Sequence, residues 1–157
     1  MTVDTIDRKA IEYLMSDGRA SWAELGAHLG LSAPAAAERV RKLQERGVVR
    51  QFAAVPGPPE AGFPVLAFVS VTLQSQSKRK AFLAAVHRNG CIQECHHVAG
   101  DDDYLLKVRC QTMGDLDRLL SHDLKGKMGV ARTRTTVVLG SAKETSALPL
   151  RVADLVE

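Results

Sequence analysis

Apolar side chains in the first fifty residues recur at helical spacing. The apolar positions 6, 10, 11 and 14 predict a first helix, and the pair Asp17 and Gly18 supplies its stop signal. Ser21 and Glu24 have the spacing of a capping box, which predicts a short second helix that ends at Gly30.

A third helix is predicted to begin at Ser32, whose hydroxyl can cap the first turn. Pro34 fits that turn because the first N–H groups of a helix have no partner within it. Ala36, Val40 and Leu43 form its apolar stripe, and a glycine at position 47 ends it.

The second and third predicted helices are joined by only two residues, Gly30 and Leu31. This connection matches the geometry of a helix-turn-helix. The extended segment Val48–Phe52 follows, and we expect it to form a wing or the first strand of a hairpin.

The apolar pattern changes its period after a segment rich in proline and glycine at residues 56–64. Beyond it we predict strand, helix, strand, strand, helix and strand over residues 65–73, 78–88, 91–98, 104–108, 116–124 and 130–139. That order is typical of the split βαβ, or ferredoxin-like, arrangement. The predicted fold class is therefore α+β, with a winged helix-turn-helix before a ferredoxin-like βαββαβ domain.

The same signals predict the domain limits. We expect a helix-turn-helix domain over residues 1–53, a linker over 54–64, a ferredoxin-like domain over 65–142 and a tail over 143–157. Within the tail, residues 152–156 are predicted to form one helical turn or a strand that needs a partner.

Composition narrows the class of protein. The chain has 157 residues, is 45% hydrophobic and 25% charged, and so resembles a globular protein rather than a fibrous or disordered one. It has no apolar run of the roughly 20 residues that a membrane span needs, and no signal peptide at its start. Its three cysteines favour reduced thiols. We therefore expect a cytoplasmic protein with no membrane partner.

Basic residues gather at the end of the third predicted helix. Between Arg39 and Arg50 five basic residues face a single acid, Glu45, an excess larger than the net charge of +3 of the whole chain. Small residues at the helix start let its backbone approach base edges in the major groove, and the later arginines and lysine can bind phosphates. The alternative is a three-helix module that contacts only proteins. The candidate DNA-binding residues are Ser32, Ala33, Ala35, Ala36, Arg39, Arg41, Lys42 and Arg46.

The segment from Cys91 to His97 invites a metal-binding interpretation, which strand geometry disfavours. Residues four apart on a strand lie about 13 Å apart, so Cys91 and Cys95 cannot share an ion. By alternation, positions 91, 93, 95 and 97 should share one face of the strand and positions 92, 94, 96 and 98 the other. We expect sheet packing here, and neither a metal nor a cofactor.

Several motifs of the chain resemble the Lrp/AsnC, or feast/famine, family of transcriptional regulators. They are Asp17-Gly18-Arg19, Leu29-Gly30-Leu31-Ser32, Gly47-Val48-Val49, Glu94-Cys95-His96-His97-Val98-Ala99-Gly100 and Gly129-Val130-Ala131-Arg132-Thr133-Arg134-Thr135. The resemblance implies a sequence-specific regulator that binds double-stranded DNA. It also implies a homodimer that assembles into a tetramer or octamer, associated with the nucleoid.

The family resemblance further implies a pocket for a small amino acid at an interface of the second domain. The corresponding residues are Gly100, Asp101, Asp102, Asp103 and Tyr104 in a turn, and Thr133 and Thr135 on the last strand. Ala99 stands where the family usually has threonine, which removes a hydroxyl near the pocket. The acidic residues Asp101 and Asp102 favour a cationic ligand.

Two alternative functions remain open from the sequence. One is an architectural, nucleoid-type DNA-binding protein without an effector, in which the phosphate contacts alone supply the binding. The other is an enzyme similar to the sirohaem decarboxylases, which resemble the same two-domain family. We expect no enzyme and no catalytic residue, because no nucleophile with an oriented base is recognisable.

Overall fold

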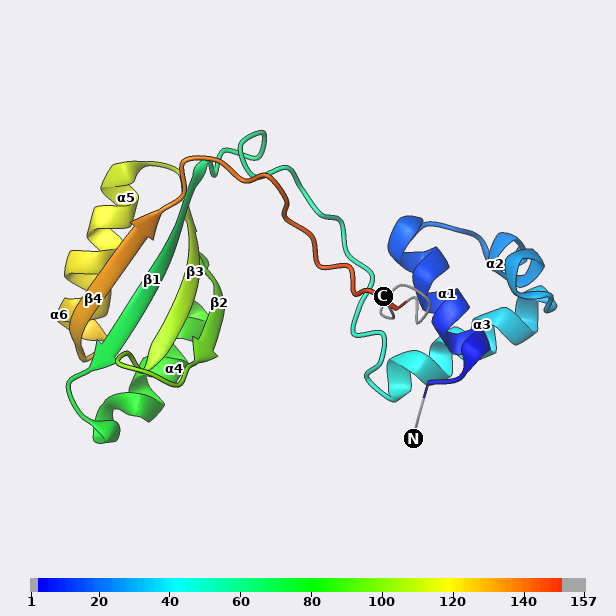
Figure 1. The fold of residues 1–157 in the computed structure, drawn as a ribbon, viewed down its shortest axis with the longest axis horizontal. Coiled ribbons are helices and arrows are strands. Elements are labelled where there is room, and N and C mark those ends of the chain that lie inside the picture. Colours follow the sequence, from blue (N-terminus) through cyan, green and yellow to red (C-terminus); the bar gives the residue numbers. More distant parts are fainter. Residues whose placement is uncertain (1–2, 151–157) are drawn as a thin grey trace, which may run out of the picture. The chain divides into compact units, whose positions relative to one another are not determined.

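The computed structural model describes residues 3–150, and its internal contacts divide the chain into two units. Within the described residues, 3–55 together with 144–150 form the N-terminal unit, and Pro56–Lys143 form the C-terminal unit (Figure 1). Each unit has its own hydrophobic core, so each is described by itself.

The N-terminal unit consists of α1 (Thr5–Ser16), α2 (Trp22–Leu29) and α3 (Ala33–Glu45). A polar side chain caps the start of each helix by accepting a backbone N–H, at Asp4, Ser21 and Ser32 respectively. Gly30 ends α2 with a φ of 68°, in the left-handed region that glycine adopts without strain. The predicted caps at Ser21 and Ser32 and the stop at Gly30 are confirmed.

The second and third helices approach each other closely at their connecting turn. A Cβ placed on Gly26 would lie 2.7 Å from the carbonyl oxygen of Leu31, so only glycine fits this position of α2. Below the turn, the predicted stripe of α3 is confirmed because its three residues are fully buried. Ala36 and Val40 pack in one core cluster with Ala10, Leu14 and Leu25.

The wing predicted after α3 is not formed. Between residues 3 and 64 the structure has no strand, and Val48 and Phe52 are exposed. A strand requires a second segment within hydrogen-bonding distance, and no ladder pairs these residues within the described part of the chain. The N–H groups of Val48 and Val49 both donate to the carbonyl of Leu43, so the start of this segment turns back on the end of α3, and the predicted wing or hairpin strand is wrong.

The C-terminal unit has the predicted ferredoxin-like order. Its strands are β1 (Val65–Leu73), β2 (Ile92–His97), β3 (Tyr104–Cys110) and β4 (Val130–Val137), and its helices are η1 (Gln76–Lys78), α4 (Arg79–Arg88), α5 (Met113–Arg118), the π-helical turn η2 (Leu119–Leu124) and α6 (Lys125–Lys127). The strand order in the sheet is β2-β3-β1-β4, with every neighbouring pair antiparallel. The α+β fold class is confirmed.

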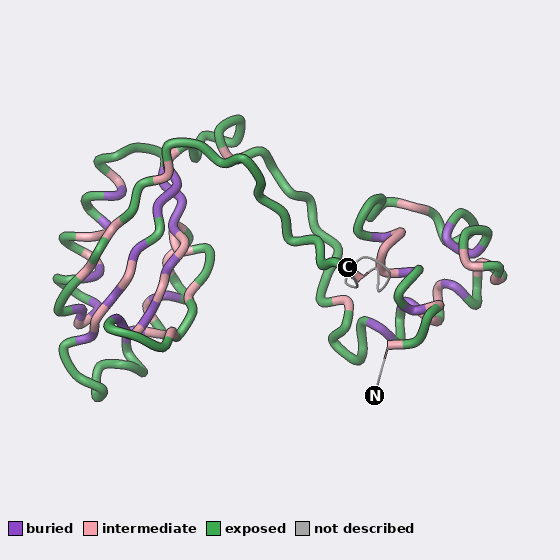
Figure 2. Tube along the Cα trace, viewed as in Figure 1, coloured by how far each residue is buried: buried purple, intermediate pink, exposed green. Residues whose placement is uncertain are grey.

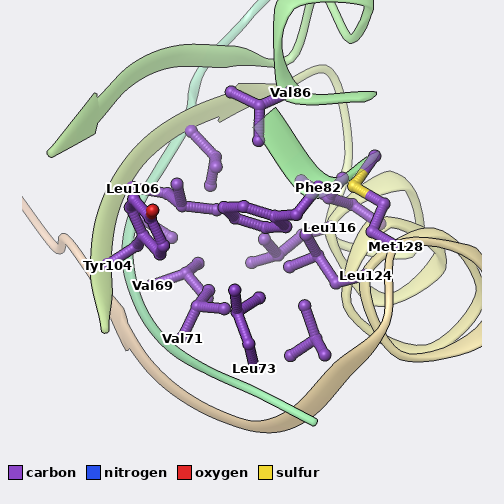
Figure 3. Close-up of a cluster of buried hydrophobic side chains, with 14 of the residues drawn as sticks. Val69, Val71, Leu73, Phe82, Val86, Tyr104, Leu106, Leu116, Leu124 and Met128 are labelled. Carbon is purple, nitrogen blue, oxygen red and sulfur yellow. The ribbon is translucent and has the colours of Figure 1, made fainter. Parts of the chain in front are cut away.

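The core of this unit lies between one face of the sheet and the helices. Phe82 of α4 sits among inward-facing strand residues such as Val69, Val71 and Leu106, with Leu116 and Leu124 beside it (Figure 3). From Ala67 to Leu73 of β1, buried positions alternate with exposed or half-buried ones, as Figure 2 shows in colour. The other face of the sheet carries Phe68, Thr72 and the arginines of β4, and we call it the open face.

The predicted alternation along β2 is wrong at its start. The pairing with β3 shifts between Ile92 and Glu94, so that Ile92 pairs with Val108 and Cys95 with Leu106. Both partners face the core, and therefore Ile92 and Cys95 lie on the same face rather than on opposite ones. The irregularity at Gln93 inserts one extra residue, which the sequence pattern does not signal.

The end of the described chain has no regular structure. Residues 141–150 form neither helix nor strand, and the predicted element at 152–156 lies outside the described residues. Over the described part of the chain, no helix is both long and apolar enough to cross a membrane.

Candidate nucleic-acid interface and ligand site

The outward surface of α3 carries most of the candidate DNA-binding residues. Ser32, Ala35, Arg41, Lys42 and Arg46 are exposed, and Ala33 and Arg39 are half-buried. Ala36 is fully buried in the core, so its assignment as a DNA contact is wrong. It belongs to the inward stripe of the helix, where no duplex can reach it.

Arg39 is held by two carboxylates from the start of α1. Its Nη1 atom lies 2.7 Å from Oδ2 of Asp4 and 2.6 Å from Oδ1 of Asp7. Asp7 is buried, and Arg46 also approaches it at 3.6 Å. The hydrogen bonds that Arg39 donates, first to Asp4 and then to Asp7, raise the pKa of Arg39. The ion pairs fix α3 against α1, which sequence reasoning missed because the partners are 32 and 35 residues apart.

The remaining cations of α3 are paired along the helix itself. Arg41 donates from Nε and Nη2 to the two carboxylate oxygens of Glu38, at 2.7 and 2.6 Å, and from Nη1 to Glu45. The Nζ atom of Lys42 lies 3.6 Å from Oε1 of Glu38. All four side chains are about half exposed, so these ion pairs contribute little to the stability of the protein. An incoming anion can therefore replace a carboxylate partner.

The turn between β2 and β3 carries the predicted ligand residues and is anchored on β1. Gly100 has a φ of 136°, which side-chain-bearing residues rarely adopt. The N–H of Asp103 donates to the carbonyl of Val71 at 2.8 Å, and Oδ2 of Asp103 accepts the N–H of Leu73 at 2.7 Å. The Asp103 carboxylate therefore holds the turn against the end of β1.

Asp102 anchors the same turn on the open face of the sheet. Its carboxylate is 7% exposed and accepts hydrogen bonds from Arg134 at 2.7 Å, Thr72 at 3.2 Å and Arg132 at 3.5 Å. Two guanidinium groups thus compensate this buried charge. Of the two residues taken to favour a cationic ligand, only Asp101 remains exposed. Asp101 is therefore the one residue of the two that still supports a cationic ligand.

Tyr104 and the two threonines lie on the core-facing side of the sheet. Tyr104 is buried, with its ring centroid 5.0 Å from that of Phe82 and 5.3 Å from that of His97. Thr133 pairs with Val71, which also pairs with Tyr104, so the three residues form one row across the sheet. Thr135 lies one row further along, opposite Val69. Both threonines are half-buried.

The hydroxyl of Tyr104 is buried and has no hydrogen-bond partner among the described residues. A buried polar group without a partner costs free energy unless a ligand, water or second chain satisfies it. A pocket of about 280 Å³ in this unit lies elsewhere, because none of the predicted ligand residues lines it. Its lining includes Phe63, Asn89, Cys91, Gln111, Asp115 and Arg118.

The segment that suggested a metal has other contacts. His96 is 3.1 Å from a carboxylate oxygen of Glu94, and that hydrogen bond, with one from Lys107, lowers the pKa of Glu94. Burial raises the pKa of the Cys95 thiol, which disfavours the thiolate that binds metal. Among residues 3–150 no group of three His, Cys, Asp or Glu side chains is arranged to hold an ion.

Two family models match the chain, one in each unit. Residues 3–44 match the AsnC-type helix-turn-helix domain, and residues 66–148 match the Lrp/AsnC ligand binding domain. The chain belongs to the Lrp/AsnC family of transcriptional regulators. The matched segments contain every predicted DNA-contact residue on α3 except Arg46, and all of the predicted ligand residues.

Relatives in this family match over nearly the whole chain. The leucine-responsive regulatory proteins of Salmonella typhimurium and Escherichia coli K12 are each 38% identical over 151 residues, which cover 95% of this chain and 92% of theirs. The match includes both units in the same order, so the two-domain organisation is that of an Lrp/AsnC regulator.

Solved Lrp/AsnC structures share the fold. One is a transcriptional regulator from Neisseria meningitidis in complex with L-methionine, with a TM-score of 0.88 and 29% sequence identity. The match covers 95% of this chain and 97% of the chain of that regulator. A feast or famine regulatory protein from M. tuberculosis, also complexed with L-methionine, has a TM-score of 0.85 at 33% identity, covering 94% of this chain and 99% of its own.

The anchoring role of Asp102 predicts the effect of removing its charge. Asp102→Asn keeps the size of the side chain but weakens its hydrogen bonds to Arg134 and Arg132, so the C-terminal unit should lose about 1–3 kcal/mol of stability. Hydrogen exchange of the backbone amides of β1 and β4 measures the stability of the C-terminal unit separately from that of the N-terminal unit. The control Asp101→Asn, at an exposed neighbour, should change stability by less than about 0.5 kcal/mol. Equal effects of the two variants would contradict the anchoring role.

Proposed function

We propose that this protein is a sequence-specific DNA-binding regulator whose assembly and activity respond to a small amino acid. The observation that carries the proposal is the presence, in one chain, of a helix-turn-helix unit with an exposed basic α3 and an Lrp/AsnC ligand binding domain. We also propose the predicted domain limits, with a linker over residues 54–64 and a tail over 143–157.

The shape and charge of α3 support major-groove binding. Ala35 is small and exposed near the helix start, which allows close approach to base edges. Lys42 lies exposed about two turns further on, where its ammonium can exchange Glu38 for a phosphate oxygen, and Arg41 lies on the same surface while it stays paired with Glu38 and Glu45. Arg39 contributes indirectly, by holding α3 in place through Asp4 and Asp7.

The contacts of the Gly100–Asp103 turn support an uncharged amino acid as effector. The relatives crystallised with L-methionine bind a side chain without charge, and in this chain Asp102 is already paired with two arginines. The unpartnered hydroxyl of Tyr104 offers a polar group beside the turn. We therefore favour an aliphatic amino acid, such as methionine or leucine, over a basic one.

The proposed regulator self-associates, as the resemblance to the Lrp/AsnC family implies. A homodimer would place two copies of α3 about one turn of the double helix apart, and further assembly to a tetramer or octamer would create the interfaces at which the effector binds. Such a regulator acts in the cytoplasm, on the nucleoid. No cofactor is proposed.

The phosphate-binding role predicts the behaviour of a Lys42→Ala variant. Loss of this cation should weaken binding to specific and random duplexes by the same factor, and should reduce the slope of log K against log salt by about 1. Fluorescence anisotropy of labelled duplexes at several salt concentrations measures both. Lys80→Ala, at an exposed lysine of α4, serves as the control and should leave the slope unchanged. An unchanged slope for Lys42→Ala would count against this contact.

The effector role predicts the behaviour of a Gly100→Arg variant. Calorimetric titration of the wild-type protein with amino acids should show saturable binding of methionine or leucine, with a change in mass by light scattering. Gly100→Arg should lose both responses while still binding DNA, because its backbone cannot easily keep a φ of 136°. Gly90→Ala is the control, because its Cβ would meet open space at an ordinary φ. Full binding by Gly100→Arg would refute the assignment of the turn.

A further inference from the structure

One acidic side chain stands on the surface of α3 that, in the proposed function, faces DNA. The side chain of Glu38 is 47% exposed. An anion on such a surface opposes the approach of phosphates, so its position needs an explanation other than affinity.

The carboxylate of Glu38 is held in a defined orientation. Arg41 binds it side-on, with one N–H donated to each oxygen at 2.7 and 2.6 Å, and the Lys42 ammonium lies 3.6 Å from Oε1. These contacts, the hydrogen bond from Arg41 first, lower the pKa of Glu38 to about 2, so the group is an ionised acceptor under ordinary conditions. A carboxylate has about four acceptor sites, and those not used by Arg41 remain open to a further donor.

The residues before Glu38 leave it as the first long polar side chain on this surface. Ala35 lies one turn earlier and presents only a methyl group. The hydroxyl of Ser32, at the helix start, already accepts the N–H of Ala35 at 3.3 Å. A helix that enters the major groove by its small-residue end therefore brings Glu38 to the base edges before any other hydrogen-bonding side chain of α3.

We propose that Glu38 is a specificity-determining residue, whose carboxylate accepts a hydrogen bond from the N4 amino group of a cytosine in the major groove. Cytosine N4 is the base-edge donor to which Asp and Glu side chains pair. Arg41 acts as a positioning residue, since it fixes the carboxylate and cancels its charge. This inference rests on the proposed function, because it requires that α3 enters the groove.

Glu45 offers a matched control for charge alone. It also pairs with Arg41 and is 57% exposed, but it lies two turns further from the small-residue end of α3. Glu38→Gln and Glu45→Gln each remove one negative charge from the same ion-pair ladder. The two variants therefore differ in distance from the base edges and not in the charge they remove.

The experiment is a selection of bound duplexes from a pool with a randomised core, using the wild-type full chain, Glu38→Gln and Glu45→Gln. The wild-type motif should contain a cytosine at one fixed position of each half-site. Glu38→Gln should lower the preference for that cytosine at least fivefold and leave the other positions intact. Glu45→Gln should retain the wild-type motif and bind all duplexes more tightly.

The proposal is overturned if Glu38→Gln selects the same motif as the wild type, because Glu38 then acts only as a charge. It is also overturned if the wild-type motif has no cytosine that depends on Glu38. A wild-type protein that binds duplexes but selects no motif contradicts sequence-specific regulation and favours an architectural protein, and one that binds no duplex contradicts DNA binding itself. Glu38→Ala, checked for folding by the fluorescence of the single tryptophan, Trp22, repeats the test without a new amide.

Discussion

The geometry of the N-terminal unit depends on the ion pairs that the buried carboxylate of Asp7 forms. This carboxylate is reached by Arg39 and Arg46 of α3, while Asp4 caps α1 and shares Arg39. Removing one member of a buried ion pair typically costs about 3–5 kcal/mol, because the other charge is left without a partner. With the Arg39 side of α3 turned toward α1, the residues at 35, 38, 41 and 42 are exposed, and this exposed surface is the one that we propose to bind DNA.

The C-terminal unit uses carboxylates in a similar way. Asp103 ties the turn after Gly100 to the backbone of β1, and Asp102 ties it to Arg134 and Arg132 of β4. In both units an acidic residue holds a functional segment against its scaffold instead of presenting a charge to a ligand. The proposed effector has an uncharged side chain for this reason, and the proposed phosphate contact of Lys42 requires only that its ammonium leaves Glu38.

Local signals in the sequence predicted most of the fold. Helix caps, glycine stops and apolar periodicity act over a few residues, and the helix starts at Ser21 and Ser32 and the strand Val65–Leu73 were predicted at their observed positions. The extra residue near Gln93 was not, because a bulge arises from pairing with β3 and leaves no mark in β2 itself. Val48–Phe52 likewise has the composition of a strand, but strand formation depends on a partner.

The candidate sites were predicted less completely than the fold, for the same physical reason. The helical period of the apolar residues predicts which positions of α3 are exposed. Ala36 belongs to the apolar stripe by that period, so its assignment as a DNA contact conflicts with the same pattern. The pairing of Arg39 with Asp7 and of Asp102 with Arg134 joins residues about thirty positions apart, which only the tertiary structure brings together. The orientation of Glu38 by Arg41 is local, and the spacing of opposite charges three residues apart could have revealed it.

The affinity of the full chain for a selected duplex, measured with and without a saturating amino acid, tests whether the two units are coupled. Methionine or leucine should change the Kd for DNA severalfold, and DNA should change the Kd for the amino acid by the same factor, because the coupling of two binding sites is reciprocal. A Kd for DNA that stays the same in the presence of every standard amino acid would show that no such coupling exists.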